Sequence, residues 1–259
     1  MKKILITGKS GYIASTLTKH LSKNHAITAI GREDFDLANL NDCRAFFSDK
    51  SYDVVIHCAV MGGNRLFKDS FECFKTNVEM FLNLKENKHK FDKLLHFGSG
   101  AEFSLTPYYY GYSKKIISSI IEETKNFYNL RIFGVFDEND LKTRFIVASI
   151  INNLKGNNIN IHENKFMDFI YMKDLVSLVE YYINMVTLSK DIDCCYKDKV
   201  TLHNIANIIN SLSDKKVKID NNRFNYQSYI GSENELPIKT IGLREGIKNT
   251  YKIIKHGME

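Results

Sequence analysis

Three residues in the middle of the chain, Ser99, Tyr110 and Lys114, have the types and the spacing that carbonyl reduction requires. Hydride transfer to a carbonyl leaves an alkoxide, which needs a proton donor within hydrogen-bond reach. A tyrosine, whose ordinary pKa is about 10, donates that proton near neutral pH only where a neighbouring ammonium stabilises the phenolate. Lys114 follows Tyr110 by one turn along the same face of a helix. We therefore predict an oxidoreductase in which these three residues are catalytic, with Ser99 donating a hydrogen bond to the substrate oxygen.

The elements that must position these residues alternate between short apolar runs and longer amphipathic stretches. This alternation predicts a Rossmann-like α/β fold, in which a doubly wound parallel sheet is covered by helices on both faces. The expected strands are 3–7, 26–30, 54–56, 94–97 and 130–133, and the expected helices are 14–22, 40–47, 69–86 and 114–126. Ser99 then ends the fourth strand and Tyr110 opens the next helix. A chance Tyr-x-x-x-Lys match in a lysine-rich chain would not have this placement.

The segment after the first expected strand has the glycine spacing of a dinucleotide-binding turn. Gly8 and Gly11 permit a tight turn and a close approach of the backbone, so that a pyrophosphate can lie on the N-terminus of the following helix. The form is Gly-x-x-Gly-x-x-Ala, which alone is a weak signal, but its place between strand and helix strengthens it. We predict that a nicotinamide cofactor binds here, at Gly8, Ser10, Gly11, Tyr12 and Ile13.

The end of the second expected strand bears on which cofactor is used. Arg32 lies where NAD-binding proteins usually have an acidic residue for the ribose hydroxyls, and an arginine can pair with a 2′-phosphate. We predict NADP(H) as the preferred cofactor, with NAD(H) left open because Glu33 and Asp34 follow. The remaining predicted contacts with the cofactor are Asp36 and Leu37 beside the adenine, Cys58, Ala59 and Val60 along the adenosine and ribose, and Tyr110 and Lys114.

Beyond residue 136 the alternation loosens into a polar link, an expected helix 144–154, a short strand 169–171, and the helices 175–185 and 202–212. We predict an NADP(H)-binding Rossmann domain made of residues 1–136 and 169–190. Residues 137–168 and 191–259 are expected to form a small C-terminal substrate-binding lobe.

Composition narrows the class of protein further. The net charge of +6 is scattered, and no basic stretch is interleaved with aromatic residues, so nucleic acid is not an expected partner. No run approaches the ~18 apolar residues of a membrane span, and the N-terminal segment has no secretory signal, so we expect a cytoplasmic protein with no membrane partner. The five cysteines show neither an even count nor a C-x-x-C spacing, and we expect no metal.

These motifs together resemble those of the extended short-chain dehydrogenases/reductases, in the NAD-dependent epimerase/dehydratase family. The resemblance covers essentially the whole chain, since it also includes Asn77 and the segments 168–175 and 243–247. It implies a nucleotide-diphosphate sugar as substrate and a homodimer as the assembly. Asn77 and Phe133 are added to the expected cofactor contacts.

Within that family, the segments 32–37, 57–64 and 97–99 are most similar to GDP-L-fucose synthase-like 4-ketoreductases. Those enzymes epimerise a 4-keto-6-deoxy sugar and then reduce it with NADPH. Ala101 and Arg144 stand where they have a cysteine and a histidine for epimerisation. The resemblance therefore implies NAD(P)H-dependent reduction of the 4-keto group without the same epimerase chemistry. A nucleotide-sugar 4-epimerase with tightly bound NAD is the alternative.

Two other functions, dehydration and dinucleotide binding without catalysis, are disfavoured by the sequence. Dehydratases of the family carry Asp-Glu where this chain has Gly100 and Ala101, although Glu102 lies one position further on. A dinucleotide-binding protein without activity is expected to have lost a catalytic residue, and all three are present. Met167 replaces an arginine that contacts the diphosphate in many relatives, which makes Arg144, Arg223 and Arg244 candidate replacements. The predicted substrate-binding residues are Met61, Asn64, Ser99, Gly100, Ala101, Arg144 and Arg223.

Overall fold

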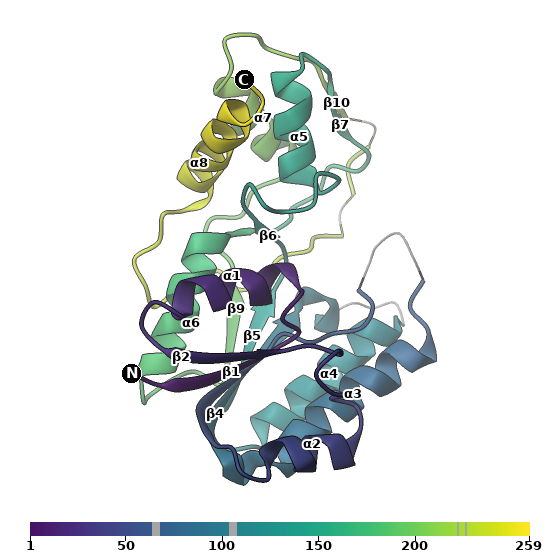
Figure 1. The fold of residues 1–259 in the computed structure, drawn as a ribbon. Helices are drawn as coiled ribbons and strands as arrows, with labels where there is room; N and C mark the ends of the chain where they lie inside the picture. The colour runs from purple at the N-terminus through teal and green to yellow at the C-terminus, as the bar shows by residue number, and fades with distance from the viewer. Residues whose placement is uncertain (64–67, 104–107, 222, 226) are drawn as a thin grey trace. The chain divides into compact units, whose positions relative to one another are not determined.

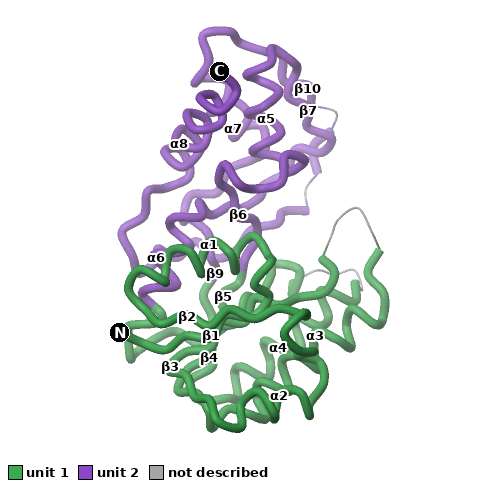
Figure 2. Tube along the Cα trace, viewed as in Figure 1, with its two compact units in different colours: residues 1–131, 182–192 green, residues 132–181, 193–259 purple. Residues whose placement is uncertain are grey.

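The structure, a computed structural model, describes residues 1–63, 68–103, 108–221, 223–225 and 227–259 (Figure 1). Within these ranges the chain divides into two compact units. Unit 1 contains residues 1–131 and 182–192, and unit 2 contains residues 132–181 and 193–259 (Figure 2). The three predicted catalytic residues all belong to unit 1.

The central sheet has six strands among the described residues, in the order β2-β1-β3-β4-β5-β9. They are β1 Lys3–Thr7, β2 Ala26–Ile30, β3 Tyr52–His57, β4 Phe91–Ser99, β5 Phe127–Ile132 and β9 Asp191–Cys194. β1 pairs in parallel with both β2 and β3, and Ile6 of β1 is in register with Ala29 of β2 and with Ile56 of β3. The strand order reverses between β1 and β3, and in open α/β sheets this switch point is where ligands bind.

Helices cover this sheet on both faces, which is why its central strands β1 and β3 are mostly apolar. Leu5 of β1 is buried, and so are its neighbours Ile4 and Ile6, whose side chains point to the opposite face. In Figure 1, α1 (Tyr12–Leu21) lies on one face, and α2 (Leu40–Phe47), α3 (Phe71–Glu86) and α4 (Tyr109–Glu122) lie on the other. Leu5 and Val55 share a core cluster with residues of α2, α3 and α4. The predicted Rossmann-like, doubly wound fold is confirmed.

Short polar side chains set the starting points of two of these helices. Asn39 caps α2 by accepting hydrogen bonds from the backbone N–H groups of Asn41 (2.9 Å) and Asp42 (3.4 Å). Ser70 caps α3 in the same way through the N–H of Cys73 (3.4 Å). Each cap satisfies a donor that has no acceptor within the helix.

Unit 2 is built from two short parallel strand pairs and from helices. Its core gathers apolar residues of α5, α7 and α8 around Phe136 and Tyr171. The strand pairs are β6 (Val135–Phe136) with β8 (Ile170–Tyr171), and β7 (Ile159–Ile161) with β10 (Ile219–Asn221). The helices are α5 Phe145–Leu154, α7 Leu202–Ser211, α8 Leu243–His256 and most of α6 (Met172–Asn184), of which residues 182–184 belong to unit 1.

Two buried aspartates of the segment 168–175 hold the connections of unit 2. Asp168 Oδ2 pairs with the Lys199 ammonium at 2.7 Å and accepts the N–H of Gly231 at 2.8 Å. Asp174 accepts the Tyr196 hydroxyl at 2.6 Å and the N–H of Gly242, just before α8, at 3.0 Å. The segment 168–175, which carries part of the family resemblance, therefore has a structural role in unit 2.

The structure moves some expected boundaries and adds elements. The helix expected over 114–126 runs from Tyr109 to Glu122. It could not have reached residue 126, because Asn126 has a φ of 62°, which a right-handed helix does not allow. The segment 243–247 opens α8, which periodicity did not predict. The assignment of the cofactor to one part of the chain and of the substrate to another stays a prediction.

Neither a membrane-spanning helix nor a cluster of metal ligands is present in the described ranges. No helix there is long and apolar enough to cross a membrane. No group of three or more His, Cys, Asp or Glu side chains in those ranges could hold a metal ion.

Candidate active site

The glycine turn brings the end of β1 against the segment that follows β3. Gly8 has a φ of +73°, and a Cβ atom there would lie 2.8 Å from the backbone nitrogen of Ala59. The Gly11 N–H donates to the Gly8 carbonyl at 2.9 Å, and Gly11 then caps α1 without a side-chain oxygen. The N–H groups of the first turn of α1 therefore begin at the switch point of the sheet. The turn is a cradle that fits a dinucleotide pyrophosphate, since the close approach of Gly8 to Ala59 leaves no room for a side chain there and the start of α1 has no side-chain cap.

We expect Gly8→Ala to disable this cradle. The new methyl group meets the backbone of Ala59, and the left-handed φ costs roughly 1–2 kcal/mol more for alanine than for glycine. The variant is expected to lose dinucleotide binding, measured by titration, and to unfold at lower denaturant concentration. Gly156→Ala is the matched control, because Gly156 has a φ of +74° with nothing within 4 Å of the added Cβ. An equal loss of dinucleotide affinity in both variants would contradict the steric explanation.

The end of β2 carries two ion pairs to the glycine turn. The Lys9 ammonium lies 2.7 Å from Asp34 Oδ2 and 3.1 Å from Glu33 Oε1. The hydrogen bonds to Asp34 and Glu33 raise the pKa of Lys9. The pKa of Asp34 is lowered first by Lys9 and then by the Gly31 N–H, whereas the pKa of Glu33 is lowered first by its own backbone N–H and then by Lys9. Arg32 is exposed, and no ion pair to it is found among the described residues.

The other predicted adenosine contacts differ in exposure. The side chain of Leu37 is buried in the core of unit 1, and its carbonyl accepts a hydrogen bond from Asn83 at 3.0 Å. Asp36 is exposed and accepts the N–H of Ala38 at 3.0 Å. Val60 is exposed, whereas Cys58 and Ala59 are half-buried. Their contacts with a cofactor stay predictions.

Asn77 of α3 is buried and holds the loop after β3. Its Oδ1 accepts the N–H of Met61 at 2.8 Å, and its Nδ2 donates to the carbonyl of the same residue at 2.9 Å. The same Nδ2 lies 3.2 Å from Ser113 Oγ, one residue before Lys114. Asn77 therefore links the predicted substrate residue Met61 to the catalytic helix.

Gly63 brings that loop onto the ring of Tyr110, a contact that the sequence analysis did not predict. Its φ is +74°, and a Cβ there would lie 2.8 Å from Tyr110 Cε2. The neighbouring Gly62 also has a positive φ, of +78°. Two adjacent glycines after a buried strand were the available signal for a close backbone approach.

Ser99 ends β4 and is held from behind by Glu102. The backbone N–H of Ser99 donates to Glu102 Oε1 at 2.9 Å, and the serine hydroxyl accepts the N–H of Ala101 at 3.2 Å. Glu102 lies in the short 3₁₀ helix Gly100–Phe103 and is buried. A Cβ on Gly111 of α4 would lie 2.7 Å from the Ala101 carbonyl, so this turn packs directly on the start of the catalytic helix.

Glu102 itself is neutralised by residues of β5. Its Oε2 accepts a hydrogen bond from Arg131 Nε at 2.8 Å, and Asn129 Nδ2 lies 3.3 Å away from the same oxygen. Arg131 also reaches Asp191 at 3.2 Å. The carboxylate that left dehydration open in the sequence is therefore engaged in a buried ion pair.

Tyr110 and Lys114 lie on the face of α4 that packs against the end of β4. The Lys114 ammonium donates to the Phe97 carbonyl at 2.6 Å and lies 5.7 Å from the centre of the Tyr110 ring. Lys114 is buried, whereas the Tyr110 side chain is partly exposed. The two conditions for a tyrosine proton donor, a neighbouring cation and an open ring, are met in unit 1.

Two histidines surround the lysine from the strands. His96 Nε2 lies 3.4 Å from the Lys114 ammonium, and the rings of His57 and His96 are 5.3 Å apart. Burial lowers the pKa of His57 to about 3 and that of His96 well below its usual range. Thr7 Oγ1 bridges His57 Nδ1 (2.9 Å) and the N–H of Ala59 (3.0 Å). Both rings are neutral and complete the buried wall behind Lys114.

The charge of Lys114 is itself perturbed by its surroundings. Burial lowers the pKa of the Lys114 ammonium to about 8, and the negative charge of Glu102 opposes this shift. The lysine therefore keeps its proton at neutral pH but loses it in mildly alkaline solution.

The remaining predicted substrate and cofactor residues are spread over the chain. Gly100 and Ala101 accompany Ser99 in unit 1, and Asn64 lies outside the described residues. Arg144 and Arg223 belong to unit 2, where the first lies 3.5 Å from Asp140 and the second pairs with Glu163. Phe133 also lies in unit 2, with its ring 5.4 Å from that of Tyr229.

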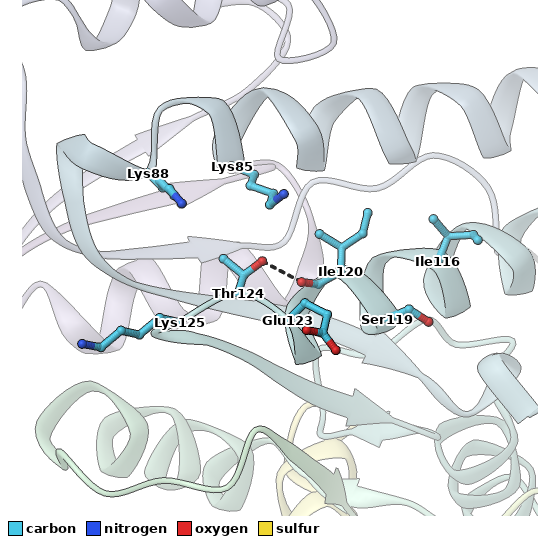
Figure 3. Close-up of a pocket in the computed structure, with 8 residues that line it drawn as sticks. All are labelled: Lys85, Lys88, Ile116, Ser119, Ile120, Glu123, Thr124 and Lys125. Carbon is cyan, nitrogen blue, oxygen red and sulfur yellow. Dashed lines mark hydrogen bonds between the residues drawn. The ribbon is translucent and has the colours of Figure 1, made fainter.

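A surface hollow of about 590 Å³ lies away from these residues, between the C-terminal parts of α3 and α4 (Figure 3). Lys85 and Lys88 come from α3 and the turn after it, and Ile116 and Ile120 come from α4. None of the residues that line it is a predicted catalytic, cofactor or substrate residue.

A glycine turn at the switch point of a doubly wound sheet, with a serine at a strand end and the Tyr110 and Lys114 pair, defines an NAD(P)-dependent enzyme of the short-chain dehydrogenase/reductase class. The chain belongs to the NAD-dependent epimerase/dehydratase family, which it matches over residues 4–193. The family predicted from the motifs is confirmed.

Known proteins similar to this chain include a sugar-nucleotide reductase, a sugar-nucleotide 4-epimerase and a CDP-sugar synthase. A GDP-mannoheptose C4 reductase from Campylobacter jejuni, with NADP bound, superposes with a TM-score of 0.81 at 18% identity, and the match covers 98% of each chain. A UDP-N-acetylglucosamine 4-epimerase from Bacillus cereus superposes with a TM-score of 0.79 at 20% identity over 100% of this chain and 98% of its own. A CDP-abequose synthase from Yersinia pseudotuberculosis is 22% identical over 257 residues, which cover 86% of this chain and 88% of the relative.

Proposed function

We propose that this chain reduces the 4-keto group of a nucleotide-diphosphate 4-keto-6-deoxy sugar with NAD(P)H, in deoxysugar and polysaccharide biosynthesis. The observation that carries the proposal is the buried Lys114 ammonium 5.7 Å from the Tyr110 ring, beside the strand that ends at Ser99. The similarity to a C4 reductase and to CDP-abequose synthase supports this class of substrate.

Each catalytic residue has one task in this reaction. The bound nicotinamide supplies the hydride. Tyr110 donates its phenolic proton to the substrate oxygen as negative charge develops there, and the Lys114 ammonium stabilises the phenolate that remains. The Ser99 hydroxyl donates a hydrogen bond to the same oxygen. Gly8 and Gly11 let the backbone approach the pyrophosphate, and Arg32 is the candidate partner of a 2′-phosphate, which favours NADP(H) over NAD(H).

A 4-epimerase with tightly bound NAD is the second candidate, favoured by the likeness to known 4-epimerases. In that reaction Tyr110 would remove the proton of the substrate 4-hydroxyl while hydride left C4 for the bound nicotinamide. After the ketosugar had turned its other face, the hydride would return to C4 and Tyr110 would return the proton to the oxygen. Dehydration is less favoured, since Glu102 is held by Arg131 and by the Ser99 N–H.

The proposed assembly is a homodimer in the cytoplasm, without nucleic acid or membrane as a partner. Its support is an apolar surface on α3 and α4, where large side chains are exposed to solvent. They are Phe71, Leu82, Tyr109, Tyr112 and Ile116. Large apolar side chains exposed on neighbouring helices are typical of an interaction surface.

The reductase is tested by incubating the purified chain with NADPH and a panel of GDP-, dTDP-, CDP- and UDP-linked 4-keto-6-deoxy sugars. We expect NADPH to be oxidised with at least one ketosugar and the product, by mass spectrometry, to be the corresponding 4-hydroxy sugar. Copurified NAD with sugar epimerised and no NADPH consumed would support the epimerase instead. No turnover of any sugar would contradict both functions.

A further inference from the structure

Lys9 is bound to the end of β2 by its backbone as well as by its side chain. Its N–H donates to the Ile30 carbonyl at 3.0 Å, and its ammonium lies 2.7 Å from Asp34 and 3.1 Å from Glu33. Asp34 Oδ2 in turn accepts the N–H of Gly31 at 2.8 Å. The first variable position of the glycine turn is therefore fixed against both carboxylates that follow β2.

This contact changes the charge that β2 presents to a dinucleotide. Glu33 and Asp34 are the residues whose carboxylates could accept ribose hydroxyls, as an acidic residue does in NAD-binding proteins. Lys9 engages both of them, while Arg32 between Gly31 and Glu33 is exposed and has no ion pair among the described residues. With Lys9 in place, the positive charges of Lys9 and Arg32 balance the negative charges of the two carboxylates.

We propose that Lys9 is a specificity-determining residue, which neutralises Glu33 and Asp34 so that Arg32 can receive the 2′-phosphate of NADP(H). The inference rests on the proposed use of NADP(H) and deepens it, since it assigns the preference to a residue of the glycine turn as well as to Arg32. Lys9 acts through the two carboxylates and not by touching the phosphate.

The size of the effect follows from the charges. A 2′-phosphate carries a charge of about −1.5 to −2, and without Lys9 it meets two carboxylates and a single arginine. In a solvent-exposed site this repulsion corresponds to a loss of about tenfold in affinity. NADH has no such phosphate, so its affinity is expected to stay the same or to rise. Exposed ion pairs contribute little to folding, so the thermal midpoint is expected to stay unchanged.

The experiment measures the dissociation constants of NADPH and NADH for the full chain at fixed ionic strength. The chain has no tryptophan, so the emission of the reduced nicotinamide itself reports binding. Lys9→Met is compared with Lys75→Met, which removes the same charge from an exposed pair with Glu79 on α3. A third variant, Lys9→Met with Glu33→Gln and Asp34→Asn, also removes the carboxylates that Lys9 covers.

We expect Lys9→Met to weaken NADPH about tenfold relative to NADH, Lys75→Met to change neither, and the triple variant to restore the wild-type ratio. Equal weakening of both dinucleotides by Lys9→Met would overturn the inference, because Lys9 would then act on a group that they share. Failure of the triple variant to restore the ratio would also overturn it, since Lys9 would be a direct phosphate ligand. A wild-type chain that binds neither dinucleotide contradicts the proposed function itself, which is a different result.

Discussion

A Tyr110→Phe chain is expected to reduce its ketosugar about 10²–10⁴-fold more slowly than the wild-type chain, because phenylalanine has no proton to give to the developing alkoxide. The ring is kept, so the packing of Gly63 against it is preserved. Dinucleotide affinity and thermal midpoint are therefore expected to remain those of the wild type. The measurement is the rate of NADPH oxidation in a single turnover with saturating ketosugar.

Tyr112→Phe is the matched control, since Tyr112 lies on the same helix with its side chain exposed. It is expected to keep the full rate. A Tyr110→Phe rate within a few-fold of the wild type would place the proton donor elsewhere and would remove the main support for the proposed mechanism.

The pH dependence of the same reaction reports on Lys114. Burial lowers the pKa of this ammonium to about 8, so it is charged below that pH and neutral above it. Because the charged form stabilises the phenolate, kcat/KM for reduction is expected to fall as the pH rises through about 8. Lys114→Met is expected to be slow at every pH and to lack this alkaline limb. A wild-type profile that is flat through this range would contradict the role of Lys114.

The parts of this fold that could be predicted from the sequence are those set by local patterns. The strand 3–7 is β1 as expected, because a buried parallel strand is apolar along most of its length, and the short apolar run 26–30 is the partly exposed edge strand β2. The pair Tyr110 and Lys114 could be found because helical spacing alone places both on one face. In each case the signal lies within one element.

The contacts that complete the site join residues that are distant in sequence, and no local sequence pattern predicts these contacts. Glu102 meets Arg131 across 29 positions, and the Asn77 clamp on Met61 spans 16. Glu102 looked like a displaced catalytic acid because only the packing of β5 shows which cation it faces. The helix α8 was not predicted, although its segment 243–247 had been noted and its buried residues Ile247 and Tyr251 are one helical turn apart, so here the local signal was present.

Glu102→Ala is expected to lower the free energy of unfolding by about 3–5 kcal/mol, because it removes the buried carboxylate from Arg131 and leaves that arginine with only the partly exposed Asp191 as an ion-pair partner. Arg131 Nε lies 2.8 Å from Glu102, and their side chains are only 10% and 3% exposed. The Ser99 N–H and Asn129 Nδ2 lose an acceptor as well. The thermal midpoint of the full chain is expected to fall by on the order of 10 °C. Glu122→Ala, at an exposed position of α4, is the control and is expected to stay within about 0.5 kcal/mol of the wild type.

The double variant Glu102→Ala with Arg131→Met distinguishes the cost of an unpaired charge on Arg131 from the cost of losing the other contacts of Glu102. Removing both members of a buried ion pair is often close to neutral, whereas removing one is not. We therefore expect the double variant to recover most of the lost stability. Its reduction rate should nevertheless stay low at a temperature where every chain is folded, because the Ser99 N–H still lacks its acceptor and the end of β4 is no longer fixed. If the double variant is as unstable as Glu102→Ala, the prediction is contradicted. The loss of stability would then come from the hydrogen bonds of Glu102 to Ser99 and Asn129, and not from an unpaired charge on Arg131.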